Sequence, residues 1–362
     1  MPADMVDREK ALKQIKLKLP RAGIDALLVS DKSNITYLTG FYSTGSLVLI
    51  TKKGMPAYFI DRMNRTLADK MLRGMDLRTV TAKSPIEKSL AGFIREIKAK
   101  RLGYDSEDIS AASYERLSDL LPGIKLVAKV NRLPVCDIVR DMRKIKKTAE
   151  IKTIRKAAKD TVRIWNEVRK DLKTGMTEQE IASMINVAIH RKGYSNSFTP
   201  IVAIGENTAY PHALAMGRRL KKREHLLVDF GIRLGGYCSD LTRIWAGGRI
   251  VRKIEELKKH VLEAHDRAIK RIKPGVRISS LVKDSNTYFI SNNLGAYILH
   301  GLGHGIGLDV HEAPFLRENS GQKLKEGMVI TIEPGLYIPG LGGIRIEDMV
   351  LVTKNGYEVL TR

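Results

Sequence analysis

The sequence has few cysteines and no long apolar run, and each shortage excludes a class of protein. Its 362 residues include only Cys136 and Cys238, which lie far apart and outside any paired motif. Neither a disulfide framework nor a cysteine zinc site is expected, so both are interpreted as small core residues. No stretch reaches the roughly 18 to 20 unbroken apolar residues of a membrane span, and the N-terminal segment lacks a secretory signal. We therefore expect a cytoplasmic protein without a membrane partner.

Acidic residues are outnumbered, and the resulting positive charge raises the question of an anionic partner. The chain has 63 lysines and arginines against 40 acids, a formal net charge of +23. Such an excess is typical of nucleic-acid-binding proteins, but here the basic residues alternate with acids, as in EIKTIRKAAKD, which indicates solvated helix faces. The densest run, RRLKKREH at 218–225, is short enough for a hairpin tip or a loop. Because base-reading motifs and aromatic stacking stripes are missing, we expect no nucleic-acid partner.

The length and the order of apolar patterns predict two domains. In residues 1–133, short apolar runs such as IDALLVS, SLVLIT and PAYFI alternate with segments of helical periodicity, which predicts an α/β domain. Residues 134–362 begin with a long charged helical stretch and continue with further helices and hairpin-connected strands. This order predicts an α+β domain whose strands are mainly antiparallel.

Two aspartates of the second domain are predicted to meet across a hairpin. Asp229 lies near the end of the apolar strand in LLVDFG. Asp240 follows in YCSDLTR, beyond a turn at Gly235 and Gly236, on the returning strand. Two carboxylates held a few ångströms apart in a site of low dielectric constant either share a proton or bind a metal ion.

Two glutamates repeat this arrangement, and one histidine adds a nitrogen ligand. Glu333 in VITIEPGLY and Glu347 in GIRIEDMVLVT are each predicted in the middle of a strand, with PGLYIPGLGG as the turn between them. His304 lies in GLGHGIG, where glycines permit close approach of the backbone. Four carboxylates and one imidazole suit two divalent metal ions, manganese or cobalt first, with iron or zinc as alternatives.

Five short segments around these residues resemble, in their order and spacing, the pita-bread metallopeptidase family that includes prolidase, aminopeptidase P and methionine aminopeptidase. The segments are LLVDFG, YCSDLTR, GLGHGIGLDVHE, TIEPG and IRIEDM. The resemblance covers essentially the whole chain. It implies a creatinase-like N-terminal domain over residues 1–133 and a pita-bread catalytic domain over residues 134–362. The resemblance implies metal ligands at the positions that in this sequence are Asp229, Asp240, His304, Glu333 and Glu347, and none of them is substituted.

The resemblance also implies roles for residues around these ligands. His212 in YPHALA and His311 in LDVHEAP match catalytic positions that hydrogen-bond the substrate and the tetrahedral intermediate. Glu333 would relay a proton towards the leaving nitrogen.

Two further residues near the ligands have open roles. Arg345, two residues before Glu347, is expected to hold Glu347 or Asp240, or to reach a substrate carboxylate. His300 is expected either to line the pocket or to pack near the glycines.

The expected activity is hydrolysis of the Xaa-Pro bond in small peptides with proline in the second position, by a homodimer. Prolidase activity on dipeptides is favoured over aminopeptidase P activity on longer peptides, because the compact length and the GLGHGIGLDVHE phrase resemble the small prolidases. Substrate length depends on what closes the cleft. Methionine aminopeptidase activity is disfavoured, because members of the family with that activity generally lack the N-terminal domain. A catalytically silent protein-binding or RNA-binding module is the alternative of a different class, and retention of all five ligands disfavours it.

Overall fold

A computed structural model describes residues 7–72, 74–81, 85–130, 133–135 and 137–362, and the chain divides into two compact units. The first unit is Met1–Arg143 and the second is Lys144–Arg362. The boundary predicted between residues 133 and 134 lies ahead of helix α6 (Asp137–Arg143), whereas the contacts group this helix with the first unit. Cys136, interpreted as a core residue, lies outside the described residues. No helix within the described part of the chain is long and apolar enough to cross a membrane.

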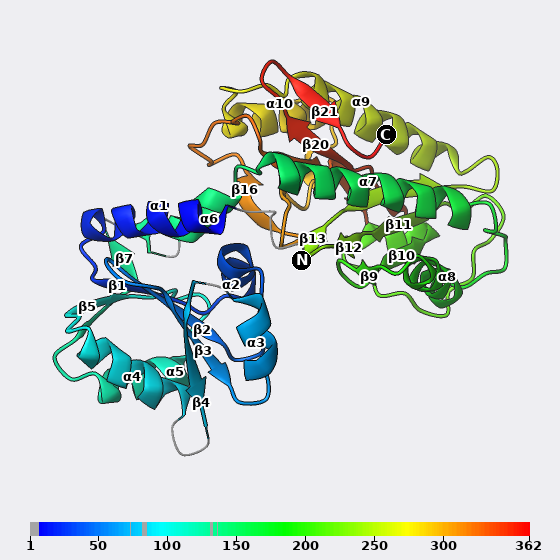
Figure 1. The fold of residues 1–362 in the computed structure, drawn as a ribbon. Coiled ribbons are helices and arrows are strands. Elements are labelled where there is room, and N and C mark those ends of the chain that lie inside the picture. The colour runs from blue at the N-terminus through cyan, green and yellow to red at the C-terminus, as the bar shows by residue number, and fades with distance from the viewer. Residues whose placement is uncertain (1–6, 73, 82–84, 131–132, 136) are drawn as a thin grey trace. The chain divides into compact units, whose positions relative to one another are not determined.

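The first unit is built on one mixed sheet with the order β4-β3-β2-β1-β5-β6. Helices α4 (Ile86–Glu96) and α5 (Ala111–Leu120) pack on one face, while α1 (Arg8–Arg21) and α6 lie across the sheet from them (Figure 1). The other elements are α2 (Lys32–Thr39), α3 (Arg65–Met71), β1 (Ala26–Val29), β2 (Leu47–Thr51), β3 (Ala57–Asp61), β4 (Asp76–Val80), β5 (Arg101–Gly103), β6 (Lys125–Val127), β7 (Lys129–Val130) and β8 (Leu133–Pro134). The predicted α/β class is confirmed.

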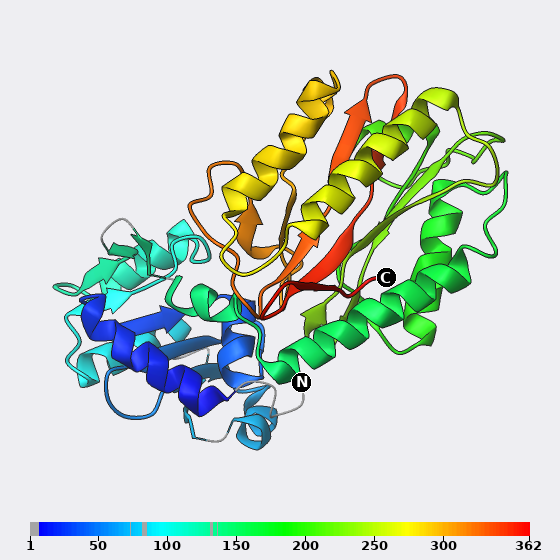
Figure 2. The same cartoon turned by 90° about the horizontal axis from the view of Figure 1, so that it is seen from above.

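The second unit places its strands between two pairs of helices (Figure 2). Helices α7 (Thr148–Val168) and α8 (Glu178–Arg191) bury one apolar cluster, and α9 (Arg252–Lys270) and α10 (Ile278–Ser291) cover two others. Helix α8 begins with a capping box. The Thr177 hydroxyl accepts a hydrogen bond from the Glu180 amide, and the Glu180 carboxylate accepts one from the Thr177 amide. This pair of bonds satisfies two amides that have no partner within the helix.

The strands of the second unit form short sheets with the orders β10-β11-β14, β13-β12-β9, β16-β15-β17-β20-β21 and β18-β19. Every pairing among its described strands is antiparallel, which confirms the predicted α+β architecture. The basic run at 218–225 is the loop before β11, as predicted. The bounds are β9 (Ser195–Asn196), β10 (Ile201–Ile204), η1 (Gly205–Ala209), β11 (Leu226–Phe230), β12 (Ile232–Leu234), β13 (Tyr237–Cys238), β14 (Leu241–Trp245), η2 (Gly295–Tyr297), β15 (Gly303–Gly305), β16 (Glu312–Leu316), β17 (Val329–Ile332), β18 (Gly335–Ile338), β19 (Gly342–Arg345), β20 (Asp348–Val352) and β21 (Tyr357–Val359).

Candidate metal centre

The aspartate pair lies on a hairpin, as predicted, although Asp240 falls just before the returning strand and not within it. Asp229 is in β11 and Asp240 directly precedes β14, and the two strands pair antiparallel with Asp229 opposite Thr242. Both aspartates are buried. Between the strands, Gly231 lies so close to the returning segment that an added Cβ would clash with the Ser239 carbonyl oxygen. Because the two segments approach closely at this glycine, Asp240 returns to the side of Asp229.

The glutamate pair is also on a hairpin, but the predicted positions within the strands are wrong. Glu333 follows β17, and Glu347 precedes β20, where Ile332 pairs with Asp348. Each acid therefore lies at an interruption between two strands, and the turn comprises only residues 339–341. An interruption frees the side chain from the strict alternation of a continuous ladder, so both carboxylates turn to the same site.

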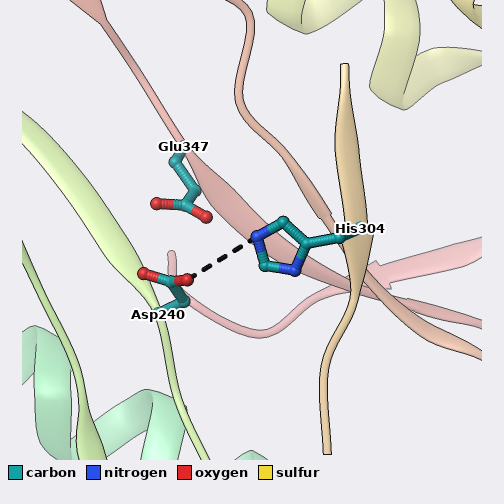
Figure 3. Close-up of side chains that lie close together, drawn as sticks. All are labelled: Asp240, His304 and Glu347. Carbon is teal, nitrogen blue, oxygen red and sulfur yellow. Dashed lines mark ion pairs between the residues drawn. The ribbon is translucent and has the colours of Figure 1, made fainter. Parts of the chain in front are cut away.

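Three of the predicted ligands converge closely. One ligand atom each from Asp240, His304 and Glu347 lies within 4.8 Å of the others, and all three residues are buried. Figure 3 shows the three side chains approaching from separate segments of the chain, with His304 Nε2 3.8 Å from Asp240 Oδ2. His304 comes from β15, which is only three residues long. A cluster of two carboxylates and one imidazole at this spacing has the composition of a divalent-metal site.

The other two predicted ligands line the same cavity and have protein partners. Glu333 Oε1 lies 3.1 Å from His304 Nε2. Asp229 Oδ2 accepts a hydrogen bond of 2.6 Å from Arg345. All five residues line a cavity of about 890 Å³. The structure therefore brings the whole predicted set together, and their role as ligands stays a prediction.

Arg345 does not hold either acid that was predicted for it. Its guanidinium donates to Asp229, to the Thr242 hydroxyl at 3.1 Å and to the Tyr337 hydroxyl at 2.8 Å. The Thr242 hydroxyl in turn donates to Glu347 at 2.8 Å. Arg345 and Thr242 thus connect the two acid pairs. Thr242 was missed although it lies two residues after Asp240 on the same strand face, whereas Tyr337 gives no sequence signal apart from its place in a strand.

The electrostatics of the centre favour a bound cation. Burial, together with Glu347 and Asp229, raises the pKa of Asp240 well above its usual range, and burial with Glu333 and Asp229 does the same for Glu347. Burial opposes ionisation of Glu333 too, but its hydrogen bond to His304 and the charge on that ring bring its pKa to about 2. One oxygen each of Asp229, Asp240 and Glu347 is fully buried without a hydrogen-bond partner among the described residues. Because unpartnered buried carboxylate oxygens are costly, the residues present fit divalent cations.

Three further histidines line the cavity. The His311 ring meets the His304 ring edge-on with centroids 4.3 Å apart. His212 lies in the loop after η1, and His300 Nε2 lies 2.7 Å from the Tyr337 hydroxyl. Burial lowers the pKa of both His300 and His311, which favours the neutral rings that exchange hydrogen bonds with a ligand. His300 is therefore at the pocket wall, one of its two expected positions.

Comparison with known proteins agrees with this site. The chain matches the Creatinase/Prolidase N-terminal domain over residues 12–145 and Metallopeptidase family M24 over residues 152–354. It is 32% identical to the Xaa-Pro dipeptidase of Pyrococcus horikoshii over 98% of this chain and 97% of that protein.

Two solved structures are similar over nearly their full length. The Xaa-Pro dipeptidase from Bacillus anthracis superposes with a TM-score of 0.92 at 30% identity, covering 98% of each chain. The X-Pro aminopeptidase from Thermotoga maritima superposes with a TM-score of 0.83 at 30% identity, covering 94% of this chain and 97% of the other. The matches extend over both units and over the residues that form the centre, and the chain belongs to metallopeptidase family M24.

Proposed function

We propose that the protein hydrolyses the Xaa-Pro bond of dipeptides with the help of two divalent metal ions, for which manganese or cobalt is favoured. The ligands of these ions are Asp229, Asp240, His304, Glu333 and Glu347. The observation that carries the proposal is that one carboxylate oxygen each of Asp229, Asp240 and Glu347 is buried beside His304 at the wall of a cavity, without a hydrogen-bond partner among the described residues. Buried carboxylate oxygens that lack a partner oppose folding of the unit, and a bound cation would supply the missing compensation. A cytoplasmic homodimer remains part of the proposal.

The residues of the centre have distinct tasks in this reaction. Bound metal ions supply Lewis-acid polarisation of the peptide carbonyl and stabilise negative charge on its oxygen. His212 and His311, at the cavity wall, donate hydrogen bonds to the substrate and to the tetrahedral intermediate. The Glu333 carboxylate takes a proton from the attacking water and delivers it to the proline nitrogen. That nitrogen is tertiary in the peptide and must gain a proton as it leaves.

Dipeptide substrates are favoured over longer peptides. The cavity of about 890 Å³ lies within the roughly 300 to 1,000 Å³ of pockets that enclose small ligands. A dipeptide fits within this volume. The similarity to the Xaa-Pro dipeptidase structure from Bacillus anthracis supports the same choice.

The test is peptide hydrolysis with and without metal. Free proline released from Met-Pro, and the first residue released from an Xaa-Pro-Yaa tripeptide, are measured with manganese or cobalt and after chelation. We expect release from the dipeptide, its loss on chelation, and its loss in Asp240→Asn. Activity confined to the tripeptide would assign an aminopeptidase P. If protein shown to contain two metal ions hydrolyses neither substrate, the proline-directed function is refuted.

A further inference from the structure

The segment 205–216 carries His212 and forms one wall of the cavity, yet several of its side chains project into solvent. Residues 211–215 line the cavity. Tyr210, Leu214 and Met216 are 66%, 80% and 62% exposed. Side chains with so little packing contribute little to fixing a backbone. The position of this segment, here called the His212 loop, must be fixed by other contacts.

A single buried carboxylate contacts both ends of the His212 loop. Glu178, the first residue of α8, is fully buried. Its Oε1 accepts hydrogen bonds from the Ile204 amide at 2.8 Å and the Asn207 side chain at 2.9 Å. Its Oε2 accepts one from the Met216 amide at 3.0 Å. Ile204 lies just before the loop, Asn207 lies in its first turn, and Met216 is its last residue. This one side chain therefore sets the distance between the two ends of the loop.

Backbone contacts reinforce the same attachment. The amides of Glu178 and Gln179 donate to the carbonyl oxygens of Arg218 and Met216, at 3.1 and 3.2 Å. Amides in the first turn of a helix have no acceptor within the helix, so the end of the loop completes the helix start. Between its ends the loop is also attached at two points: the Thr208 hydroxyl accepts a hydrogen bond from the Gly343 amide at 2.7 Å, and the Pro211 carbonyl accepts one from Arg345 at 3.2 Å.

We propose that Glu178 is a positioning residue for peptide hydrolysis: by holding both ends of the His212 loop, it fixes His212 at the cavity wall. A buried acid with three donors in fixed directions specifies one position of the loop, whereas an apolar side chain would fill the space without specifying it. The inference rests on the proposed function, because it assigns His212 a part in that reaction. Glu178 itself does not touch the substrate.

Glu178→Gln is the sharpest test because it preserves shape. A glutamine has one acceptor oxygen, so its amide group faces either Met216 or the Ile204 and Asn207 donors, and one end of the loop loses its hydrogen bonding to this side chain. We expect kcat/KM on Met-Pro to fall by roughly 10- to 100-fold, since displacement of a positioned group by about 1 Å has this effect. Glu180→Gln is the matched control. Glu180 lies in the first turn of the same helix, is exposed and takes part in the capping box, so its substitution should change kcat/KM less than about twofold.

A double-mutant cycle with His212→Ala separates positioning from general destabilisation. If Glu178 acts through His212, the double variant Glu178→Gln/His212→Ala is no slower than His212→Ala alone. Glu180→Gln/His212→Ala should show the two effects multiplied. A further decrease of kcat/KM in the Glu178 double variant, or an unchanged rate in Glu178→Gln, would overturn the inference.

Hydrogen exchange gives a readout that does not depend on activity. We expect amides of residues 205–216 to exchange faster in Glu178→Gln than in wild type, and at the wild-type rate in Glu180→Gln. Loop release in a protein that cleaves no proline peptide would refute the proposed function while supporting the attachment. If Glu178→Gln fails to fold, Asn207→Ala removes one of the three donors, and unchanged exchange and unchanged kcat/KM in that variant would contradict the inference.

Discussion

Lys146 and Glu312 form a buried ion pair whose disruption should strongly destabilise the second unit. The two side chains are 1% and 8% exposed, and their charged atoms are 2.7 Å apart. Lys146→Met keeps much of the side-chain volume but removes the charge, so the Glu312 carboxylate stays buried without its ammonium partner. Breaking a buried pair in this way costs about 3 to 5 kcal/mol.

The free-energy change converts to a readily measured shift in melting temperature. For units of 150 to 250 residues, 1 kcal/mol corresponds to about 2 to 4 °C, so the expected decrease in Tm is roughly 6 to 20 °C. Tryptophan fluorescence reports it selectively, because both tryptophans, Trp165 and Trp245, lie in the second unit. A chelator present throughout removes the stabilisation that bound metal would add.

An exposed ion pair provides the control. Lys192 and Glu167 are 2.9 Å apart but their side chains are 34% and 54% exposed, so Lys192→Met should cost less than about 1 kcal/mol. The double variant Lys146→Met/Glu312→Leu, which replaces the buried pair with apolar side chains, should recover most of the lost stability. If Lys146→Met unfolds no earlier than Lys192→Met, the assignment of a buried pair is refuted.

Three further predictions concern metal, packing and pH. Manganese or cobalt at 100 times its dissociation constant should raise the free energy of unfolding by about 2.7 kcal/mol in calorimetry, and Asp240→Asn should abolish most of that gain. Gly231→Ala places a Cβ against a backbone carbonyl, so urea denaturation should show a loss of about 2 kcal/mol or more; an unchanged midpoint would contradict the close approach. Burial opposes ionisation of Asp160, but hydrogen bonds from Lys156 and Tyr194 lower its pKa. Its stabilising effect is therefore present above the unfolded pKa of about 4 and is lost as pH falls through the lower folded value. The difference in unfolding free energy between wild type and Asp160→Asn should be largest near pH 7 and should shrink below pH 4, whereas a constant difference would refute the assignment.

The sequence predicts the two hairpins of the centre because each combines β-branched residues, an acid and a glycine-containing turn. It misplaces Glu333 and Glu347 within strands, since β-branched residues continue on both sides of each acid and hide the strand interruptions.

Cys238 is buried as expected, and burial raises the pKa of its thiol to about 11. These features depend on local pattern, and local pattern is what a single sequence contains.

Side-chain partners far apart in the chain are not contained in that pattern. Arg345 was expected to hold Glu347 or Asp240, but it donates to Asp229, the other acid of the aspartate hairpin. The contacts of Glu178 with Ile204 and Met216 depend likewise on how α8 meets the sheet. Such pairings follow from tertiary packing, which propensity and spacing do not specify.

The position of the glutamates at the base of their hairpin affects how the chain tolerates changes in length. Register is set at the base by Ile332 opposite Asp348, and along β18 and β19 by Gly335 opposite Arg345. The tip, residues 339–341, lies beyond both sets of pairs and is largely exposed. Residues inserted at the tip would lengthen the loop and leave the strand pairing that places Glu333 and Glu347 intact. An insertion between Glu333 and β18 would instead shift Glu333 relative to Glu347. The hairpin is therefore expected to tolerate changes in length at its tip but not at its base.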